Sequence, residues 1–92
     1  MTETIIETEL DKLVKESLGD VKKLMLYNDD ISSFELVIDC LQKYCKHGPL
    51  QAEQVANIVH YNGCCDIKHG DFNTLLPIYT AFLDAKLKVM IE

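Results

Sequence analysis

The chain has 92 residues, of which 48% are hydrophobic, and this size and composition predict one globular domain with a single core. The formal net charge is −6 and the lysines form no cluster, which argues against nucleic acid as a partner because phosphate binding needs grouped basic side chains. Since no stretch has the length and hydrophobicity of a membrane span and the first residues do not resemble a signal peptide, we expect a cytoplasmic protein with no membrane partner.

Acidic side chains dominate the beginning of the chain. The acids of residues 1–20 outnumber the two lysines there; they are Glu3, Glu7, Glu9, Asp11, Glu16 and Asp20. A few apolar residues could line one face of a short helix, which would be marginal by itself; they are Leu10, Leu13, Val14 and Leu18. We therefore expect residues 1–20 to form an acidic, flexible N-terminal extension that is mobile or loosely docked, and residues 21–92 to form the folded domain.

The folded domain is predicted to begin with a strand and a capped helix. Residues 22–27 (KKLMLY) are typical of a strand, and Asn28-Asp29-Asp30 is typical of a turn. Ser32 followed by Glu35 matches a capping box, which predicts that a helix begins there. Apolar residues then recur at helical spacing; they are Phe34, Val37, Ile38, Leu41 and Cys45. We expect this helix to end at residues 46–48.

A second helix and a short strand are predicted next. Pro49 suits the first position of a helix, and Asn62-Gly63 is a typical helix end. The predicted buried face consists of Ala52, Val55, Ala56 and Val59. Residues 64–68 indicate a short strand, which residues 69–71 should close as a turn.

The last elements complete an α+β fold. A third helix is expected over about residues 75–85, with Pro77 in or near its first turn. Leu87, Val89 and Ile91 alternate with Lys88 and Met90, as in a strand with one buried face. The predicted order is β-α-α-β-α-β, a three-stranded antiparallel sheet packed against three helices.

Three separated features agree with one another, although each alone is more often structural than functional. They are the turn at residues 28–30, the helix that follows it with FELVIDCLQ at residues 34–42, and HYNG at residues 60–63. Together they resemble the ClpS family of adaptors of the N-degron pathway. The resemblance is continuous from about residue 22 to residue 63 and looser to residue 92. Residues 1–20 lie outside it, as the variable N-terminal extension of that family does.

The resemblance implies recognition of a free protein N-terminus and no catalysis. In the family an Asn, a turn carboxylate and a His hold the α-ammonium group, which implies Asn28, Asp29 or Asp30, and His60 in this chain. The first side chain, which is Leu, Phe, Tyr or Trp, enters an apolar pocket. By position, the pocket residues are Ser32, Phe34, Val37, Ala56, Val59 and Leu87. The implied partner is the N-terminal domain of a Clp-class AAA+ unfoldase; no cofactor is implied, and we expect a monomer.

Two residues depart from the commoner pattern of that family. Phe34 stands where a flexible Met often gates the pocket, and Ala56 stands where another Met often lines it. One side chain is bulkier and the other is much smaller than in those relatives. We expect a reshaped pocket whose space near Ala56 favours large aromatic residues.

Three other interpretations use the same residues. A small metal-binding protein or a thiol enzyme could be built on His60, Cys64, Cys65 and His69. Adjacent cysteines on a strand point to opposite faces, and the neighbouring Asp66 should raise a thiol pKa, so both fit poorly. All four cysteines are expected to be reduced. The third interpretation is an interaction domain of the same fold that has lost recognition of the amino terminus.

Overall fold

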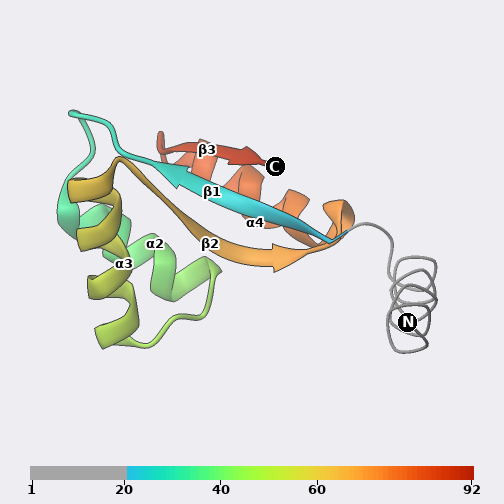
Figure 1. Cartoon of the computed structure of the whole chain (residues 1–92), viewed down its shortest axis with the longest axis horizontal. Helices are drawn as coiled ribbons and strands as arrows, with labels where there is room; N and C mark the ends of the chain where they lie inside the picture. Colours follow the sequence, from blue (N-terminus) through green and yellow to red (C-terminus); the bar gives the residue numbers. More distant parts are fainter. Residues whose placement is uncertain (1–20) are drawn as a thin grey trace, which may run out of the picture.

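The computed structural model describes residues 21–92 (Figure 1). Its elements, in chain order, are β1 (Lys22–Tyr27), α2 (Phe34–Tyr44), α3 (Pro49–Asn62), β2 (Cys64–Gly70), α4 (Phe72–Asp84) and β3 (Lys88–Ile91). The predicted order and the α+β class are confirmed. The expectation of a flexible extension concerns residues 1–20, which lie outside the described residues.

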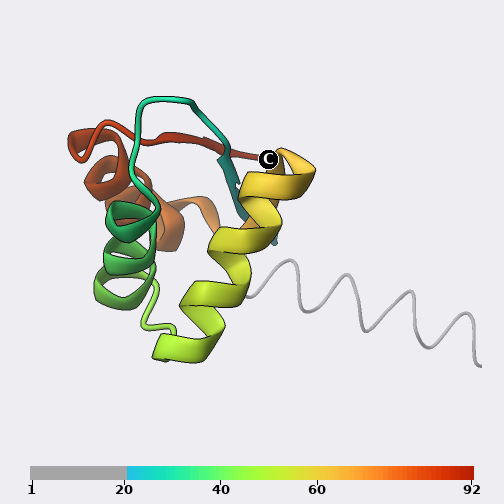
Figure 2. The ribbon, with the colours of Figure 1, turned by 90° about the vertical axis from the view of Figure 1, so that its left-hand side faces the viewer.

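The sheet has β1 in its centre, with the strand order β2-β1-β3 and both pairings antiparallel. Leu24 and Leu26 of β1 are almost fully buried, and Leu26 lies opposite the buried Val89 of β3. Because successive strand residues point to opposite faces, these side chains define one buried face. Figure 2 shows α2, α3 and α4 on the same side of the strands. The core therefore lies between one sheet face and the three helices.

The helices contribute the remaining core. The largest fully buried side chains are Phe82, Leu24, Leu26, Leu41 and Leu75. Burying a Leu or Phe side chain contributes about 1.5–3 kcal/mol, so these residues supply much of the hydrophobic stabilisation. Tyr44 of α2 packs against Phe82 of α4 with ring centroids 5.9 Å apart, which joins the two helices. None of the helices within residues 21–92 combines the length and hydrophobicity that a bilayer crossing needs.

The predicted N-cap of α2 is wrong by one residue. The cap is Ser33, whose side chain accepts a hydrogen bond of 3.1 Å from the Leu36 amide, whereas the sequence pattern had indicated Ser32. Ser32 instead hydrogen-bonds to Asp29 of the preceding turn. At the other end, α2 stops at Tyr44, and the left-handed residue beyond it is Lys46 (φ 62°). Either of the two adjacent serines could cap the helix. Ser33 is the cap, and Ser32 is hydrogen-bonded within the preceding turn.

The boundary between β2 and α4 also differs from the prediction. β2 continues to Gly70, and α4 begins at Phe72 rather than near Leu75. Asp71 is the cap, because its carboxylate accepts a hydrogen bond of 2.8 Å from the Thr74 amide. Pro77 lies inside the helix. It has no amide hydrogen to donate to the Asn73 carbonyl, but Leu75 and Phe82 on either side of it are still buried.

Candidate functional site

A pocket of about 240 Å³ opens between the end of β1, the start of α2 and the last turns of α3. All ten residues proposed from the sequence line it, together with Tyr27; they are Asn28, Asp29, Asp30, Ser32, Phe34, Val37, Ala56, Val59, His60 and Leu87. Ala56, Val59 and Leu87 are each only 3% exposed, so they form the floor. The exposed side chains of Asn28, Asp30 and His60 form a polar mouth. The pocket is therefore apolar at depth and polar at its entrance.

The polar mouth forms because β1 and α3 end at the same place. Tyr27 pairs with Cys64, and the Asn28 amide then donates a hydrogen bond of 2.8 Å to the Gly63 carbonyl. Gly63 closes α3 in a left-handed conformation (φ 95°), and its amide donates to Val59 over 3.0 Å. This backbone link holds the turn at residues 28–30 beside the helix end that carries His60.

The left-handed Gly63 yields a first testable prediction. A side chain at this φ costs about 1–2 kcal/mol, although the space around the Cα is open. Gly63→Val should therefore lower the free energy of unfolding by that amount, measured by urea titration. Gly63→Asn should lower the free energy of unfolding clearly less, because Asn tolerates the left-handed region. Equal losses for Val and Asn would show that backbone conformation is not the cause.

The two aspartates of the turn differ in their hydrogen bonds. Asp29 Oδ1 accepts from the amides of Ile31 (2.9 Å) and Ser32 (2.6 Å), and Asp29 Oδ2 accepts from Ser32 Oγ (3.1 Å). These bonds, above all the one from the Ser32 amide, hold the pKa of Asp29 below its usual value. The exposed Asp30 receives no comparable bond from residues 21–92. Asp29 therefore stabilises the turn, whereas the Asp30 carboxylate can bind a group at the mouth of the pocket.

Tyr27 lines the pocket and was missed in the sequence analysis. Its hydroxyl donates to Glu92, and this bond is the main reason that the pKa of Tyr27 is raised. Lys88 Nζ lies 6.0 Å from the centre of the Tyr27 ring. Strand alternation assigns Tyr27 to the face opposite Leu26, so the pattern excluded it from the core. The sequence feature that could have indicated a place in the pocket is the position of Tyr27 directly before Asn28.

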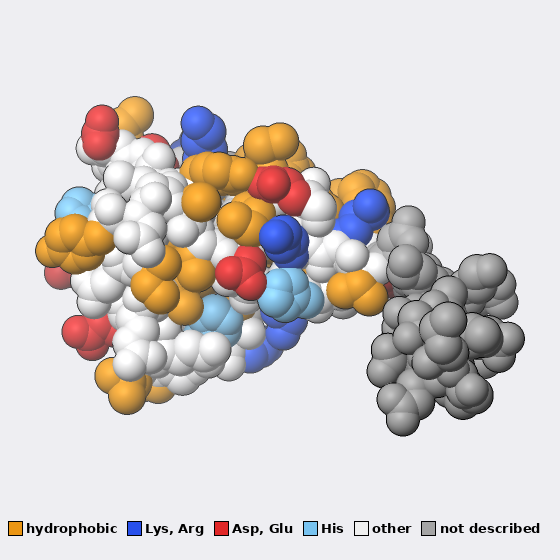
Figure 3. All heavy atoms as spheres, in the orientation of Figure 1, with side chains coloured by type: hydrophobic (Ala, Val, Ile, Leu, Met, Phe, Trp, Pro, Cys, Tyr) orange, Lys and Arg blue, Asp and Glu red, His pale blue; other side chains and the backbone are white. Residues whose placement is uncertain are grey.

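The charged side chains that line the pocket favour the binding of a cation. The lining contains two carboxylates and no lysine. On the face shown in Figure 3, acidic and His side chains but no Lys lie at the left-hand end, which corresponds to the turn and the end of α3 in Figure 1. A positively charged group is therefore attracted to the mouth, while an apolar group fits the floor.

The pocket holds a Ser, a His and two Asp residues, which raises the question of nucleophilic catalysis. A serine nucleophile needs a hydrogen bond to the base that activates it. Ser32 Oγ instead donates to Asp29, and the His60 ring makes an edge-to-face contact with Tyr61 at 4.9 Å between centroids. The geometry is that of a turn and a binding surface rather than of a catalytic triad.

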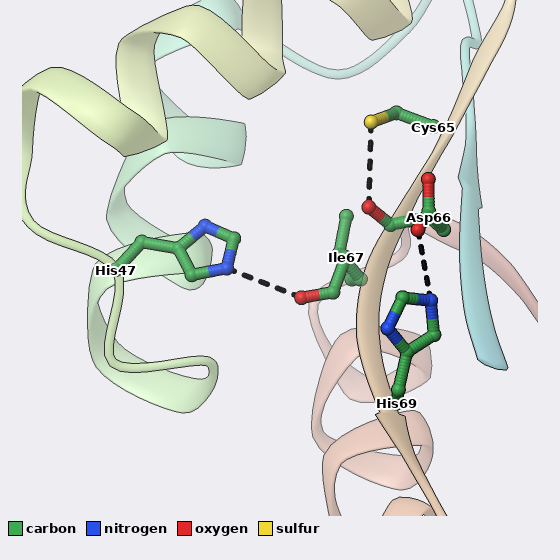
Figure 4. A network of polar contacts seen from close by, with 5 residues as sticks. All are labelled: His47, Cys65, Asp66, Ile67 and His69. Carbon is green, nitrogen blue, oxygen red and sulfur yellow. Dashed lines mark hydrogen bonds and ion pairs between the residues drawn. The ribbon is translucent and has the colours of Figure 1, made fainter. Parts of the chain in front are cut away.

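The alternative built on cysteines and histidines is not assembled in the described part of the chain. Figure 4 shows His69 turned toward Asp66, with Nε2 2.8 Å from Oδ2, and Cys65 turned toward the Asp66 carbonyl. Burial, followed by the charge of Asp66, raises the pKa of the Cys65 thiol, which disfavours a reactive thiolate. Within residues 21–92, no three His, Cys, Asp or Glu side chains are grouped to hold a metal ion.

His47 has a structural contact in the same region. Its ring Nε2 lies 3.1 Å from the Ile67 carbonyl, as Figure 4 shows. The pairing of β1 with β2 is irregular here, since Leu24 faces Lys68 and Met25 faces Asp66. Ile67 is therefore the extra residue of a bulge, and its carbonyl accepts a hydrogen bond from His47. This contact fastens the loop before α3 to the sheet.

Comparison with known proteins gives a consistent result. The family model described as "ATP-dependent Clp protease adaptor protein ClpS" matches residues 20–78. The ClpS adapter proteins of Salmonella paratyphi B and Salmonella newport are each 38% identical over 61 residues, which cover 60% of this chain. The match spans 58% of the length of these curated relatives.

A solved structure shows the same fold. It is that of Agrobacterium tumefaciens ClpS2 bound to L-phenylalaninamide. The TM-score is 0.68 at 19% sequence identity, and the superposition covers 78% of this chain and 94% of that one.

Proposed function

The chain belongs to the ClpS family, and on that basis we propose that it is an adaptor that binds the free α-amino group and bulky first side chain of N-degron proteins. Support comes from the pocket at the end of β1, in which an apolar floor and an anionic mouth meet. The ligand of the solved ClpS2, L-phenylalaninamide, has the same two features, an α-amino group and an aromatic side chain.

The mouth provides what an α-ammonium group requires. An ammonium removed from water is costly unless its N–H groups find acceptors and its charge is balanced. Asn28 supplies an amide oxygen, His60 supplies a ring nitrogen when neutral, and Asp30 supplies a carboxylate. We assign the charged contact to Asp30 because the carboxylate of Asp29 is engaged by its own turn. Asp29 then acts by holding Ser32 and the turn in place.

The floor provides the selectivity for a bulky residue. A cavity of about 150 Å³ can admit benzene, so a pocket of about 240 Å³ has room for an aromatic side chain. Burying such a side chain contributes about 2–3 kcal/mol, which corresponds to a preference of roughly thirty- to a hundredfold over glycine. A bulky apolar first residue is therefore favoured, and the resemblance to the family implies Leu, Phe, Tyr or Trp.

Delivery requires a second partner. The family description names an adaptor of the ATP-dependent Clp protease, and we propose that the adaptor binds the N-terminal domain of the Clp-class AAA+ unfoldase. The adaptor catalyses no reaction in this scheme, because it transfers a bound protein without changing a covalent bond. The cytoplasmic location and the monomeric state stay predictions.

A peptide pair tests the proposed function. A labelled peptide that begins with Phe should bind the full chain, as measured by fluorescence anisotropy. The same peptide with one Gly added before the Phe should bind roughly thirtyfold or more weakly, because Gly then occupies the pocket. Equal affinity for the two peptides would refute recognition of the first residue, and so would the absence of binding by the Phe peptide at millimolar concentration.

A further inference from the structure

A second apolar groove, of about 250 Å³, lies between α4 and the end of β3. It is lined by Phe72, Leu76, Tyr79, Met90 and Ile91. Phe72, Leu76 and Met90 are 47%, 40% and 53% exposed, and none of the lining side chains is charged. A continuous exposed patch of this kind usually marks a surface that another segment or protein covers.

The groove lies at the end of the sheet where residues 1–20 join the described domain. Lys22, the first residue of β1, pairs with Gly70, which precedes α4 by two residues. Lys23 exchanges two backbone hydrogen bonds of 2.8 Å with Glu92, directly beyond Ile91. Figure 1 shows β1 beginning where β2 ends and α4 begins. The chain therefore enters β1 beside both walls of the groove.

The sequence before β1 contains a matching apolar stripe. Residues with i, i+3, i+4 and i+8 spacing share one face of a helix, and here they are Leu10, Leu13, Val14 and Leu18. We propose that residues 10–18 of the same chain bind in the groove between α4 and β3. In such a helix Lys12 would fall on the face opposite the stripe and Lys15 on its flank, so both lie outside the apolar stripe.

The dimensions and the tether agree with this occupant. The groove follows α4 from Phe72 to Tyr79, about 10 Å, and a helix over residues 10–18 is about 12 Å long. Leu18 is four residues from Lys22, so the connection spans at most about 13–14 Å. A short tether creates an effective concentration on the order of millimolar, which favours this segment over a second copy at micromolar concentration. Within residues 21–92, β3 is an edge strand paired only with β1, so its outer side is open.

Paired substitutions in the full chain test the docking. Leu13→Gln combined with Val14→Gln removes the middle of the apolar stripe, and Lys12→Gln combined with Lys15→Gln is the matched control outside the stripe. By amide hydrogen exchange, the first pair should speed exchange in residues 10–18 on the order of tenfold and also deprotect residues 72–79 and 88–91. The control pair should leave the exchange of all three segments as in the unmodified chain.

A reciprocal variant identifies the groove itself. Leu76→Gln, at a half-exposed site, should speed exchange in residues 10–18 to the same extent as the arm variant. The proposal is overturned if neither variant changes exchange in the other segment, or if the protection disappears on dilution, which would indicate a second copy. Binding of the Phe peptide should be unchanged in every variant, since the first pocket is at the other end of β1. A variant that no longer bound the Phe peptide would therefore bear on the proposed function and not on the docking of residues 10–18.

Discussion

Replacing Asp30 with Asn should weaken the binding of a peptide with a free N-terminal Phe by roughly ten- to a hundredfold. Asn keeps the shape of the side chain but removes the charge that balances the ammonium group. A hydrogen bond between charged groups contributes about 1.5–3 kcal/mol, and each 1.4 kcal/mol corresponds to a factor of ten in affinity. Fluorescence anisotropy with the labelled peptide gives the ratio directly.

Two comparisons identify the charge as the cause. An acetylated peptide has no ammonium group, so it should bind weakly to the unmodified chain and should lose little further affinity in Asp30→Asn. The adjacent Asp29→Asn should reduce affinity less than Asp30→Asn, because the Asp29 carboxylate faces Ile31 and Ser32. Greater loss of affinity in Asp29→Asn than in Asp30→Asn, measured under conditions in which both variants are fully folded, would reassign the ammonium contact to Asp29.

Asp29 should affect stability instead, and in a pH-dependent manner. Its pKa is lower in the folded chain than in the unfolded chain, so its contribution is fully present above the unfolded value of about 4. The contribution decreases as the pH falls toward the folded value. The difference in unfolding free energy between the unmodified chain and Asp29→Asn should therefore be larger at pH 7 than at pH 3.

Replacing Ala56 with Met should reduce the affinity for peptides that begin with Trp by roughly ten- to a hundredfold. Ala56 is buried in the pocket floor, and a longer side chain there occupies the space that a large ring needs. Forcing extra methylene groups into a packed site costs about 1–3 kcal/mol. A peptide that begins with Leu should lose much less affinity, because it fills less of the pocket.

A substitution elsewhere on α3 provides the control. Gln54 is exposed on the opposite side of this helix, so Gln54→Met introduces the same side chain away from the pocket. It should leave the affinities for both peptides unchanged. If Ala56→Met reduced Leu and Trp binding equally, the space beside Ala56 would not determine the preference. Stronger binding of Leu than of Phe, Tyr and Trp by the unmodified chain would contradict the preference itself.

Several parts of the fold could be predicted from local sequence because the interactions concerned are short-range. Pro49 and Gly63 delimit α3, since one needs no amide donor and the other accepts a left-handed backbone. Alternation identified the buried Leu87 and Val89. The residues of the candidate pocket were obtained differently. They came from resemblance to a family, because no local rule joins Asn28 to His60 across the intervening chain.

What the sequence determined by itself was the order of the elements, the buried faces and the polar residues available at their ends. Only the tertiary structure decided which of Ser32 and Ser33 is the cap, which of Asp29 and Asp30 is hydrogen-bonded within its own turn, and whether Tyr27 borders the pocket. The physical reason is the range of the interactions. Helix and strand patterns depend on neighbours within a few residues, whereas the pocket brings together residues that are far apart in the chain, from the end of β1, from α2, from α3 and from Leu87 before β3. The backbone contact between Asn28 and Gly63, which continues the pairing of β1 with β2, joins two of these segments.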